Sequence, residues 1–352
     1  MTGVLARPSG PGSGPDGVPA AIALTPILSA RYRPQNLARI ATAAPGSRLV
    51  SVSLEGLADG ELGDVEVLLR GPLPRGIFDR LLARCPRLKW VHSATAGVER
   101  VLTPAALERG LAITNARGVF SGPIAEYVLL MMLAVSRRLP QLLELQRERT
   151  WQPLEATELS DVTVGVVGLG SIGRRVAELA TAFGCRVVAT RRDAEAGSAA
   201  GLDAAGDPLS SGLAEVLPAD RLPELLAQSD FVVLALPLTR QTESLINVAS
   251  LAHVKPGAWL INVARGRLVD ERALLRALRE GPLGGAVLDT FRDEPLPPDS
   301  PFYDLPNVIL TPHTSWSSGR VLDRSIELFC DNLDRFRRGE PLHNLVDAGA
   351  GY

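Results

Sequence analysis

Three residues with the chemistry of an acid–base site, Arg265, Glu294 and His313, each follow a short apolar run. Histidine titrates near neutral pH, so it can serve as a general acid or base. A neighbouring carboxylate favours the imidazolium and fixes the orientation of its ring. Arginine can hold a carboxylate through two parallel hydrogen bonds. Together, the three residue types predict proton transfer on a small molecule that carries a carboxylate.

A second set of residues has the spacing of a phosphate-binding loop. Its glycines lie between an apolar run at residues 164–167 and a helical pattern that stops at Gly184. The first glycine allows a tight turn, the second lets a pyrophosphate approach the backbone, and the third lets helix pack close to strand. The phosphates would lie at the positive end of the helix dipole. The predicted cofactor contacts are Gly168, Gly170, Ser171, Ile172 and Gly173.

The same glycine spacing occurs a second time, at Gly12, Gly14 and Gly17. No strand pattern precedes this copy, and it lies in a segment rich in Gly, Pro and Ser. Such composition cannot bury enough apolar surface to order itself, so residues 1–20 are predicted to be a disordered tail. Context therefore selects the later loop as the dinucleotide site.

The end of the next predicted strand bears on the choice of cofactor. NAD-specific folds place an acidic residue there to bind the ribose 2′-hydroxyl, whereas arginine accommodates a 2′-phosphate. This strand ends in Arg191 and Arg192, and the first acid is Asp193. Two guanidinium groups suit a dianionic phosphate, so NADP(H) is favoured. The alternative is NAD(H), with Asp193 on the ribose and both arginines solvated.

Length and composition set the class of protein. The chain has 352 residues, which fits two domains, and its net charge of −2 leaves no basic surplus for nucleic acid. Three widely spaced cysteines, no metal-binding motif and no N-terminal signal pattern fit a cytoplasmic protein without a metal. The longest uncharged apolar run, residues 127–136, is too short to span a membrane.

Strand and helix patterns alternate along almost the whole chain. Strands are predicted at residues 21–24, 48–54, 65–69, 88–93, 112–115, 164–167, 185–189, 231–235, 259–262, 285–288 and 308–310. Helices are predicted at residues 35–44, 77–84, 104–109, 171–183, 222–228, 250–251, 271–279 and 319–338. Residues 194–217 are expected to form a loop. This order predicts an α/β fold with parallel sheets covered on both faces.

The fold class that we predict is two Rossmann-like or flavodoxin-like doubly wound parallel-sheet domains with an active-site cleft between them. Residues 21–112 and 316–352 would form the substrate domain, and residues 113–315 the dinucleotide-binding domain. In such sheets ligands bind beyond the carboxyl ends of the strands, where the chemical residues are predicted to gather. A long apolar helical region at 123–151, interrupted by Pro140, is expected to be buried between domains or subunits.

The chain resembles the D-isomer-specific 2-hydroxyacid dehydrogenase family from about residue 21 to its end. The matching segments are residues 93–98 (SATAGV), 113–115 followed by Gly118, 125–127 (AEY), the glycine loop, 236–239 (LPLT), 261–266 (INVARG), 269–271, 288–289, 294–295 and 311–313 (TPH). The resemblance implies hydride transfer between a nicotinamide cofactor and a 2-oxo acid. The apolar region at 123–151 favours a homodimer, in which Trp151 could lie at the interface.

The resemblance also implies a role for each matching residue. Arg265 would bind the substrate carboxylate and keto oxygen, His313 would be the general acid/base, and Glu294 would hold that histidine. The backbone N–H groups of Ala96, Gly97 and Val98 would receive the carboxylate. Trp316 departs from the family pattern, in which small residues follow the histidine, and would narrow or floor the substrate pocket. Asp289 would bond the nicotinamide amide. The remaining cofactor contacts implied are Pro237, Thr242 and Val263.

Arg191 departs from the family's usual acid and points to the glyoxylate/hydroxypyruvate reductase subset that prefers NADPH. The predicted function is therefore reduction of a small 2-oxo acid to the D-2-hydroxy acid. The alternatives are an NAD-dependent phosphoglycerate- or lactate-type dehydrogenase, or a nucleotide-sensing corepressor-like protein on the same fold. The sequence leaves open which acid is reduced, and in which direction.

Overall fold

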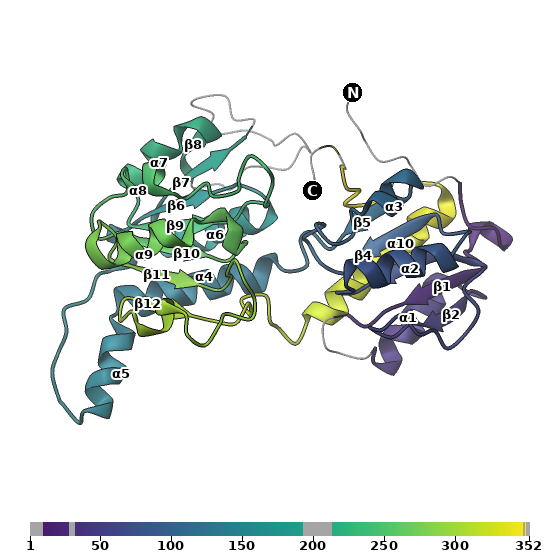
Figure 1. Ribbon diagram of the computed structural model, residues 1–352, viewed down its shortest axis with the longest axis horizontal. Helices are drawn as coiled ribbons and strands as arrows, with labels where there is room; N and C mark the ends of the chain where they lie inside the picture. The colour runs from purple at the N-terminus through teal and green to yellow at the C-terminus, as the bar shows by residue number, and fades with distance from the viewer. Residues whose placement is uncertain (1–9, 28–31, 193–212, 348, 350–352) are drawn as a thin grey trace. The chain divides into compact units, whose positions relative to one another are not determined.

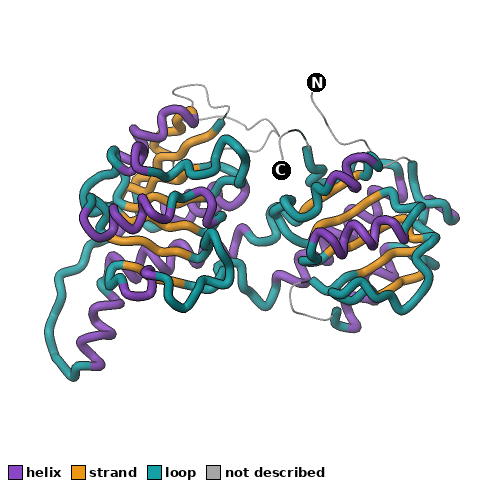
Figure 2. The backbone as a smooth tube through the Cα atoms, in the orientation of Figure 1, coloured by secondary structure: helices purple, strands orange, loops and turns teal. Residues whose placement is uncertain are grey.

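The computed structural model describes residues 10–27, 32–192, 213–347 and 349 of the chain. The chain divides into two compact units, one of Met1–Phe120 with Ser318–Tyr352 and one of Ser121–Ser317 (Figure 1). Each unit is built on a parallel sheet, five-stranded in the first and seven-stranded in the second (Figure 2). The prediction of two α/β domains with parallel sheets is confirmed.

The first unit has the strand order β2-β1-β3-β4-β5. Parallel neighbours need helical crossovers, and the helices bury both faces of the sheet. The strands are β1 (Ala21–Leu24), β2 (Arg48–Ser51), β3 (Val65–Arg70), β4 (Trp90–Ser93) and β5 (Ala112–Asn115). The helices are α1 (Pro34–Ala43), α2 (Arg75–Arg84), α3 (Pro104–Glu108) and α10 (Val321–Arg338).

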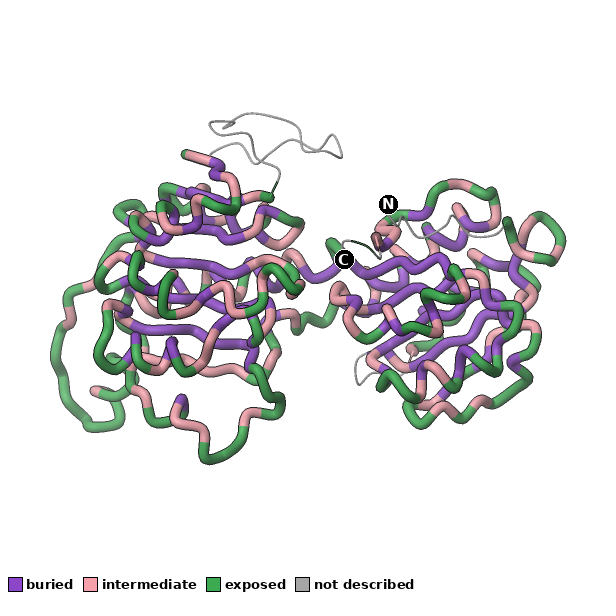
Figure 3. The backbone as a smooth tube through the Cα atoms, turned by 45° about the horizontal axis from the view of Figure 1, so that its top comes forward, coloured by how far each residue is buried: buried purple, intermediate pink, exposed green. Residues whose placement is uncertain are grey.

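Each face of this sheet has its own hydrophobic core. On one face Phe78 and Leu82 of α2 pack against the strands. On the other, Trp90 stacks on Phe329 and Phe336 of α10, with ring centroids 5.3 and 5.6 Å apart. Figure 3 shows the strands of both units as the buried layer, in purple. The last helix thus completes a core that the first third of the chain begins.

A buried histidine makes the stability of this unit depend on pH. His92 on β4 is fully buried; its Nδ1 lies 2.8 Å from Thr114 Oγ1, and its ring packs against Phe329. Burial lowers the pKa of His92 from 6.5 to about 3, because the charged ring would lose its hydration. The folded protein therefore keeps this ring neutral at pH values where an unfolded chain binds a proton.

We expect the free energy of unfolding to fall as pH drops from about 6.5 towards 3, with no such contribution of His92 above that window. Between pH 7 and pH 5 the contribution is about 2 kcal/mol. Denaturant unfolding of the wild type and His92→Gln at both pH values measures it. The loss on acidification should be smaller in the variant by about that amount. An equal loss in both proteins would contradict the prediction.

The segment before β1 is held by a buried carboxylate. Glu66 on β3 is 1% exposed and accepts hydrogen bonds from the backbone N–H groups of Ser13 and Ala20, at 3.0 and 2.8 Å. Lys89 pairs with it at 2.9 Å. These contacts correct the prediction of a disordered tail for residues 10–20, while residues 1–9 lie outside the described residues. The composition of the segment does not predict this order, because the acceptor for its backbone N–H groups is Glu66, which is distant in the sequence.

The boundary between the units differs from the predicted one. β5 pairs with β4 along its whole length, so it belongs to the first sheet rather than to the connection leaving it. The first unit accordingly runs to Phe120 instead of residue 112, and resumes at Ser318 instead of residue 316. A short apolar strand carries no local sign of which sheet it will join.

The second unit has the strand order β12-β11-β10-β9-β6-β7-β8. The strands are β6 (Thr163–Val167), β7 (Arg186–Arg191), β8 (Leu213–Pro218), β9 (Phe231–Leu234), β10 (Trp259–Asn262), β11 (Gly285–Leu288) and β12 (Val308–Leu310). The helices are α4 (Ser121–Ser136), α5 (Leu139–Arg147), α6 (Ser171–Ala182), α7 (Leu222–Gln228), α8 (Val248–Leu251) and α9 (Glu271–Glu280). The order reverses at β6, which has β7 on one side and β9 on the other. Open α/β sheets bind ligands at such a switch point.

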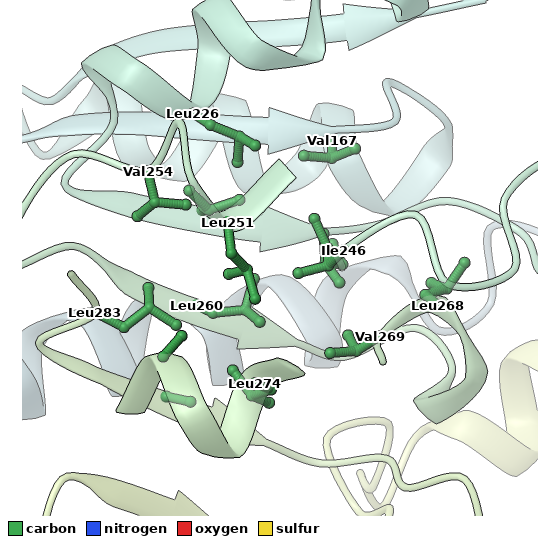
Figure 4. Packing of buried hydrophobic residues seen from close by; sticks show 14 of the residues in the cluster. Val167, Leu226, Ile246, Leu251, Val254, Leu260, Leu268, Val269, Leu274 and Leu283 are labelled. Carbon is green, nitrogen blue, oxygen red and sulfur yellow. The ribbon is translucent and has the colours of Figure 1, made fainter. Parts of the chain in front are cut away.

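The core of this unit fixes the strands whose ends matter for function. Figure 4 shows Leu226 of α7, Leu251 of α8 and Leu274 of α9 in one hydrophobic cluster with Leu260 of β10. Helices α4 and α6 pack against each other, and Figure 1 shows them behind the sheet. Both faces are covered, so the polar edge at the strand ends is the part of the sheet left for ligands.

The helical region predicted at 123–151 is two helices. α4 ends at Ser136, and α5 begins at Leu139 after Arg138 adopts a left-handed conformation, with φ 56°. Pro140 lies in the first turn of α5, where its missing N–H costs no hydrogen bond. Within the described part of the chain, no helix is long and apolar enough to cross a membrane.

The predicted loop at 194–217 lies mostly outside the described residues, which resume at residue 213. Its last residues, however, form β8, which pairs with β7 from Val187↔Leu213 to Arg191↔Pro218. The loop prediction is therefore wrong for residues 213–217. The alanine- and glycine-rich composition of the preceding segment hides a short edge strand.

Candidate active site

The candidate residues of the second unit lie along one edge of its sheet. Strand register aligns Leu234, Asn262, Leu288 and Leu310 side by side at the carboxyl ends of β9, β10, β11 and β12. The loops that leave these four positions therefore emerge together. They carry Arg265, three residues after Asn262, the segment from Asp289 to Glu294, and His313, three residues after Leu310.

The glycine loop between β6 and α6 has the shape that a dinucleotide needs. Gly168 has φ 98°, and a Cβ there would meet the Ala235 carbonyl oxygen at 2.9 Å. A Cβ on Gly173 would lie 2.0 Å from the Gly168 oxygen, so helix and turn pack too closely for any side chain. At Gly170 a Cβ would meet no atom within 4 Å. The space that this glycine leaves open lies at the N-terminus of α6, where a pyrophosphate is favoured.

Ser171 and Ile172 begin α6 directly after this loop, which puts their backbone N–H groups in its first turn. Arg191 is the last residue of β7 and is half-buried, while Arg192 follows it and is exposed. Asp193, the acid of the NAD(H) alternative, lies outside the described residues. The glycine cradle and the two arginines fit a phosphate-bearing dinucleotide.

His313 and Glu294 are brought together, as predicted. His313 Nδ1 lies 2.8 Å from Glu294 Oε2, and both side chains are a little over one-third exposed. Burial tends to raise the pKa of Glu294, but hydrogen bonds from His313 and from the Phe291 N–H, with the nearby charge of Arg265, bring the pKa below its usual value. Because an ionised carboxylate only accepts, Nδ1 carries the proton in this contact. Nε2 is then the nitrogen left for a substrate.

Arg265 follows β10 and is positioned through its backbone. Asn262 Nδ2 donates to the Arg265 carbonyl oxygen at 3.0 Å. Asn262 Oδ1 accepts a hydrogen bond from the Ala264 N–H at 3.1 Å. Arg265 Nη1 donates to the Ala264 oxygen at 2.8 Å. Asn262 is 1% exposed, so this arrangement is part of the buried structure.

The loops of Arg265 and Glu294 are also packed backbone to backbone. A Cβ on Gly266 would lie 1.9 Å from the Phe291 carbonyl carbon, which only glycine allows. Arg292 donates its backbone N–H to Glu271 Oε1 at 2.8 Å, so the acidic residue that begins α9 holds the same loop. The loops that carry Arg265 and Glu294 are thus packed together at one edge of the sheet.

The other residues of this unit that are predicted to contact cofactor or substrate also lie in the segments that follow the strands. Asp289 is fully buried and accepts hydrogen bonds from the turn that carries His313, which leaves its predicted bond to a nicotinamide amide a prediction. Trp316 donates its indole N–H to the His313 carbonyl oxygen at 2.7 Å. Thr242 donates to the Pro237 carbonyl oxygen at 2.8 Å and so closes the turn after β9. Val263 is buried directly after β10.

The predicted carboxylate-binding loop belongs to the first unit, where it follows β4. Its carbonyl groups are occupied: Thr95 Oγ1 donates to the Gly97 oxygen at 2.9 Å, and Asn115 donates to the Ala96 oxygen at 3.1 Å. Among the described residues, the backbone N–H groups of Ala96, Gly97 and Val98 donate to no protein acceptor. Successive N–H groups held in this way suit an anion.

Sequence reasoning missed residues that act over long range. Asn262 stands out only as a polar residue that ends an apolar strand, and this local sign could have identified it. The requirement for Gly266 arises from the approach of the 291–292 backbone, and the partner of Tyr127 is Thr311, 184 residues away. Neither contact can be predicted from the residues that neighbour it in the sequence.

Known proteins are similar to this chain over both units. Residues 129–315 match the family model "D-isomer specific 2-hydroxyacid dehydrogenase, NAD binding domain". A glyoxylate reductase of Korarchaeum cryptofilum is 34% identical over 289 residues, 80% of this chain and 81% of that protein. A D-3-phosphoglycerate dehydrogenase of Mycobacterium bovis is 38% identical over 273 residues, 77% of this chain. The match covers 49% of the length of that protein, so this chain spans about half of it.

A solved structure gives the same fold. The NADPH-dependent glyoxylate/hydroxypyruvate reductase of Sinorhizobium meliloti, in complex with NADP and sulfate, is 29% identical with a TM-score of 0.79. The match covers 94% of this chain and 100% of that one. The likeness therefore extends well beyond the cofactor-binding unit.

Proposed function

The chain belongs to the D-isomer specific 2-hydroxyacid dehydrogenase family, and we propose that it reduces a small 2-oxo acid of the glyoxylate and hydroxypyruvate class. The product is the D-2-hydroxy acid, and the reductant is NADPH in preference to NADH. The proposal depends above all on the 2.8 Å contact between His313 Nδ1 and Glu294 Oε2, at the sheet edge that also carries Arg265.

The proposed mechanism assigns each group one task. The reduced cofactor supplies, when bound, the hydride that reduces the keto carbon. His313 donates the Nε2 proton to the keto oxygen, and Glu294 stabilises the imidazolium and holds its Nδ1–H. Arg265 binds the carboxylate and compensates the negative charge that grows on the keto oxygen. The backbone N–H groups of residues 96–98 receive the carboxylate, and Trp316 borders the substrate.

Initial rates with glyoxylate, hydroxypyruvate, pyruvate and 3-phosphohydroxypyruvate, each with NADPH and with NADH, test the proposal. We expect the highest kcat/KM for glyoxylate or hydroxypyruvate with NADPH. Turnover of 3-phosphohydroxypyruvate or pyruvate with NADH above these would favour the phosphoglycerate- or lactate-type alternative. Cofactor binding without turnover of any acid would favour the corepressor-like alternative.

The cofactor preference is assigned to Arg191. Replacing it by alanine should weaken NADPH binding about 10- to 100-fold, the loss expected for charge-assisted hydrogen bonds, and leave NADH binding nearly unchanged. Fluorescence titration of each reduced cofactor measures both values. Arg186→Ala is the matched control, because that arginine lies on the same strand and donates to Gln228 at 2.6 Å. Equal losses for both cofactors in Arg191→Ala would tell against a 2′-phosphate contact.

We further propose that the protein is a homodimer that covers exposed apolar residues of α4, α5 and the following segment. Leu130, Leu142 and Trp151 are 55%, 40% and 101% exposed. Large apolar side chains that are this exposed favour association where a partner can cover them. Sedimentation analysis should give the mass of two chains, and Leu142→Glu should shift it towards one. Leu57→Glu, on the first unit, is the control; a monomeric wild type would contradict this proposal.

A further inference from the structure

The turn that carries His313 needs outside support. His313 has φ 50°, a left-handed conformation that is uncommon for residues other than glycine. Such a conformation persists only where the surroundings fix it. The His313 N–H donates to the Thr311 carbonyl oxygen at 3.0 Å, and its own carbonyl accepts the Trp316 indole N–H. These contacts shape the turn, but all of them lie within it.

The outside support is the buried carboxylate of Asp289. Its Oδ1 accepts the Thr311 hydroxyl at 2.6 Å and the Thr314 N–H at 2.8 Å. Its Oδ2 accepts the Ser315 N–H at 3.0 Å. All three donors come from the turn, on both sides of His313. Asp289 itself is fixed at the end of β11, where its N–H donates to the Asn262 carbonyl oxygen at 3.0 Å.

Tyr127 extends this set of contacts to α4. Its hydroxyl oxygen lies 2.6 Å from Thr311 Oγ1. The single hydroxyl proton of Thr311 is directed at Asp289, which as a carboxylate can only accept, so Tyr127 is the donor to Thr311. Burial raises the pKa of Tyr127 to about 12, so the phenol is protonated and able to donate at neutral pH. The proton donors therefore run in one direction, from Tyr127 to Thr311 to Asp289.

We propose that Tyr127 is a positioning residue for His313, acting through Thr311 and Asp289 to hold the turn on which the imidazole stands. The inference rests on the proposed function, in which His313 is the proton donor. Tyr127 does not touch Glu294 or His313 in the described contacts, so its effect passes through the turn. Losing the hydroxyl leaves Thr311 with one partner fewer and the turn free to shift relative to Glu294.

Tyr127→Phe removes only the hydroxyl and tests the proposal. With glyoxylate and saturating NADPH, kcat should fall about three- to tenfold, the effect of one lost hydrogen bond. The Kd of NADPH should change by less than about twofold, since no cofactor contact is lost. Tyr303→Phe, an exposed tyrosine of the same unit, is the matched control and should leave kcat unchanged. Thermal unfolding shows that each variant is folded.

The decisive comparison repeats the substitution in His313→Asn. A residue that acts through His313 has no effect once the imidazole is gone, so Tyr127→Phe should then lower the residual kcat by less than about twofold. A general packing role would lower kcat equally in both backgrounds, and that result would overturn the proposal. So would an unchanged kcat for Tyr127→Phe in an active protein.

Thr311 gives an independent test from the other side of the same bond. Thr311→Val should lower kcat at least as much as Tyr127→Phe, and the double variant should lose little more than Thr311→Val alone. Thr311→Ser keeps the hydroxyl and should retain activity. Full additivity of the two losses would contradict the inference. A wild type that reduces no 2-oxo acid would instead contradict the proposed function, so the two failures are distinct.

Discussion

Replacing Arg265 by alanine is expected to lower kcat/KM for glyoxylate by at least about 1,000-fold, because one side chain serves both the carboxylate and the developing oxyanion. Asn262 and the close passage of Gly266 hold the backbone on either side independently of the Arg265 side chain, so the substitution leaves the loop in place. The Kd of NADPH should therefore stay within about threefold of the wild-type value, since no assigned cofactor contact is removed. Steady-state rates and a fluorescence titration measure the two quantities.

The matched control for this variant is Arg267→Ala. Arg267 lies two residues further along the chain and is exposed. It pairs with Glu243 at 2.7 Å, and neither residue is assigned a role in binding or catalysis. Its loss should leave kcat/KM within about twofold, as for other surface ion pairs. Should Arg265→Ala weaken NADPH binding as much as it lowers turnover, its role would lie with the cofactor or the fold rather than with the substrate.

His313→Asn is expected to lower kcat by about 100- to 10,000-fold, the range for loss of a general acid. Asparagine tolerates the left-handed backbone of residue 313, so the turn is expected to keep its shape. KM for the acid should change much less than kcat, because Arg265 and the 96–98 loop are assigned the carboxylate. Glu294→Gln should fall between this variant and the wild type, since it keeps the imidazole but removes the charge beside it.

His253→Asn serves as the control for the loss of an imidazole, because His253 follows α8 and is exposed. It should leave kcat unchanged. Loss of activity in His313→Asn that appeared only as a raised KM would indicate a binding role and contradict proton donation by this residue.

Much of the fold could be predicted because parallel strands and their helices leave strong local patterns. The apolar runs at 164–167, 231–235, 259–262 and 285–288 fall on β6, β9, β10 and β11, and the glycines fall on the turn before α6. Strand ends in a parallel sheet share one edge, so Arg265, Glu294 and His313 could be predicted to gather from their positions after such runs.

The rest depends on partners distant in sequence. Glu66 accepts hydrogen bonds from Ser13 and Ala20 and so holds the segment before β1. Nothing in the sequence of that segment indicates this partner. Pro140 is predicted to interrupt a helix but lies in the first turn of α5, because α4 ends at Ser136 and the left-handed Arg138 separates the two helices. In the sequence, Tyr127 is indistinguishable from the other residues of an apolar helix. Its contact with Thr311 forms only when α4 packs against the sheet. Local periodicity predicts elements, whereas these contacts follow from how the elements pack.

The configuration of the product is the most direct test of the proposed D-specific reduction. Purified protein is given hydroxypyruvate and NADPH, and the glycerate formed is separated on a chiral column and compared with the NADPH consumed. We expect D-glycerate in an amount equal to the NADPH oxidised. L-Glycerate, or oxidation of NADPH without glycerate, would contradict it.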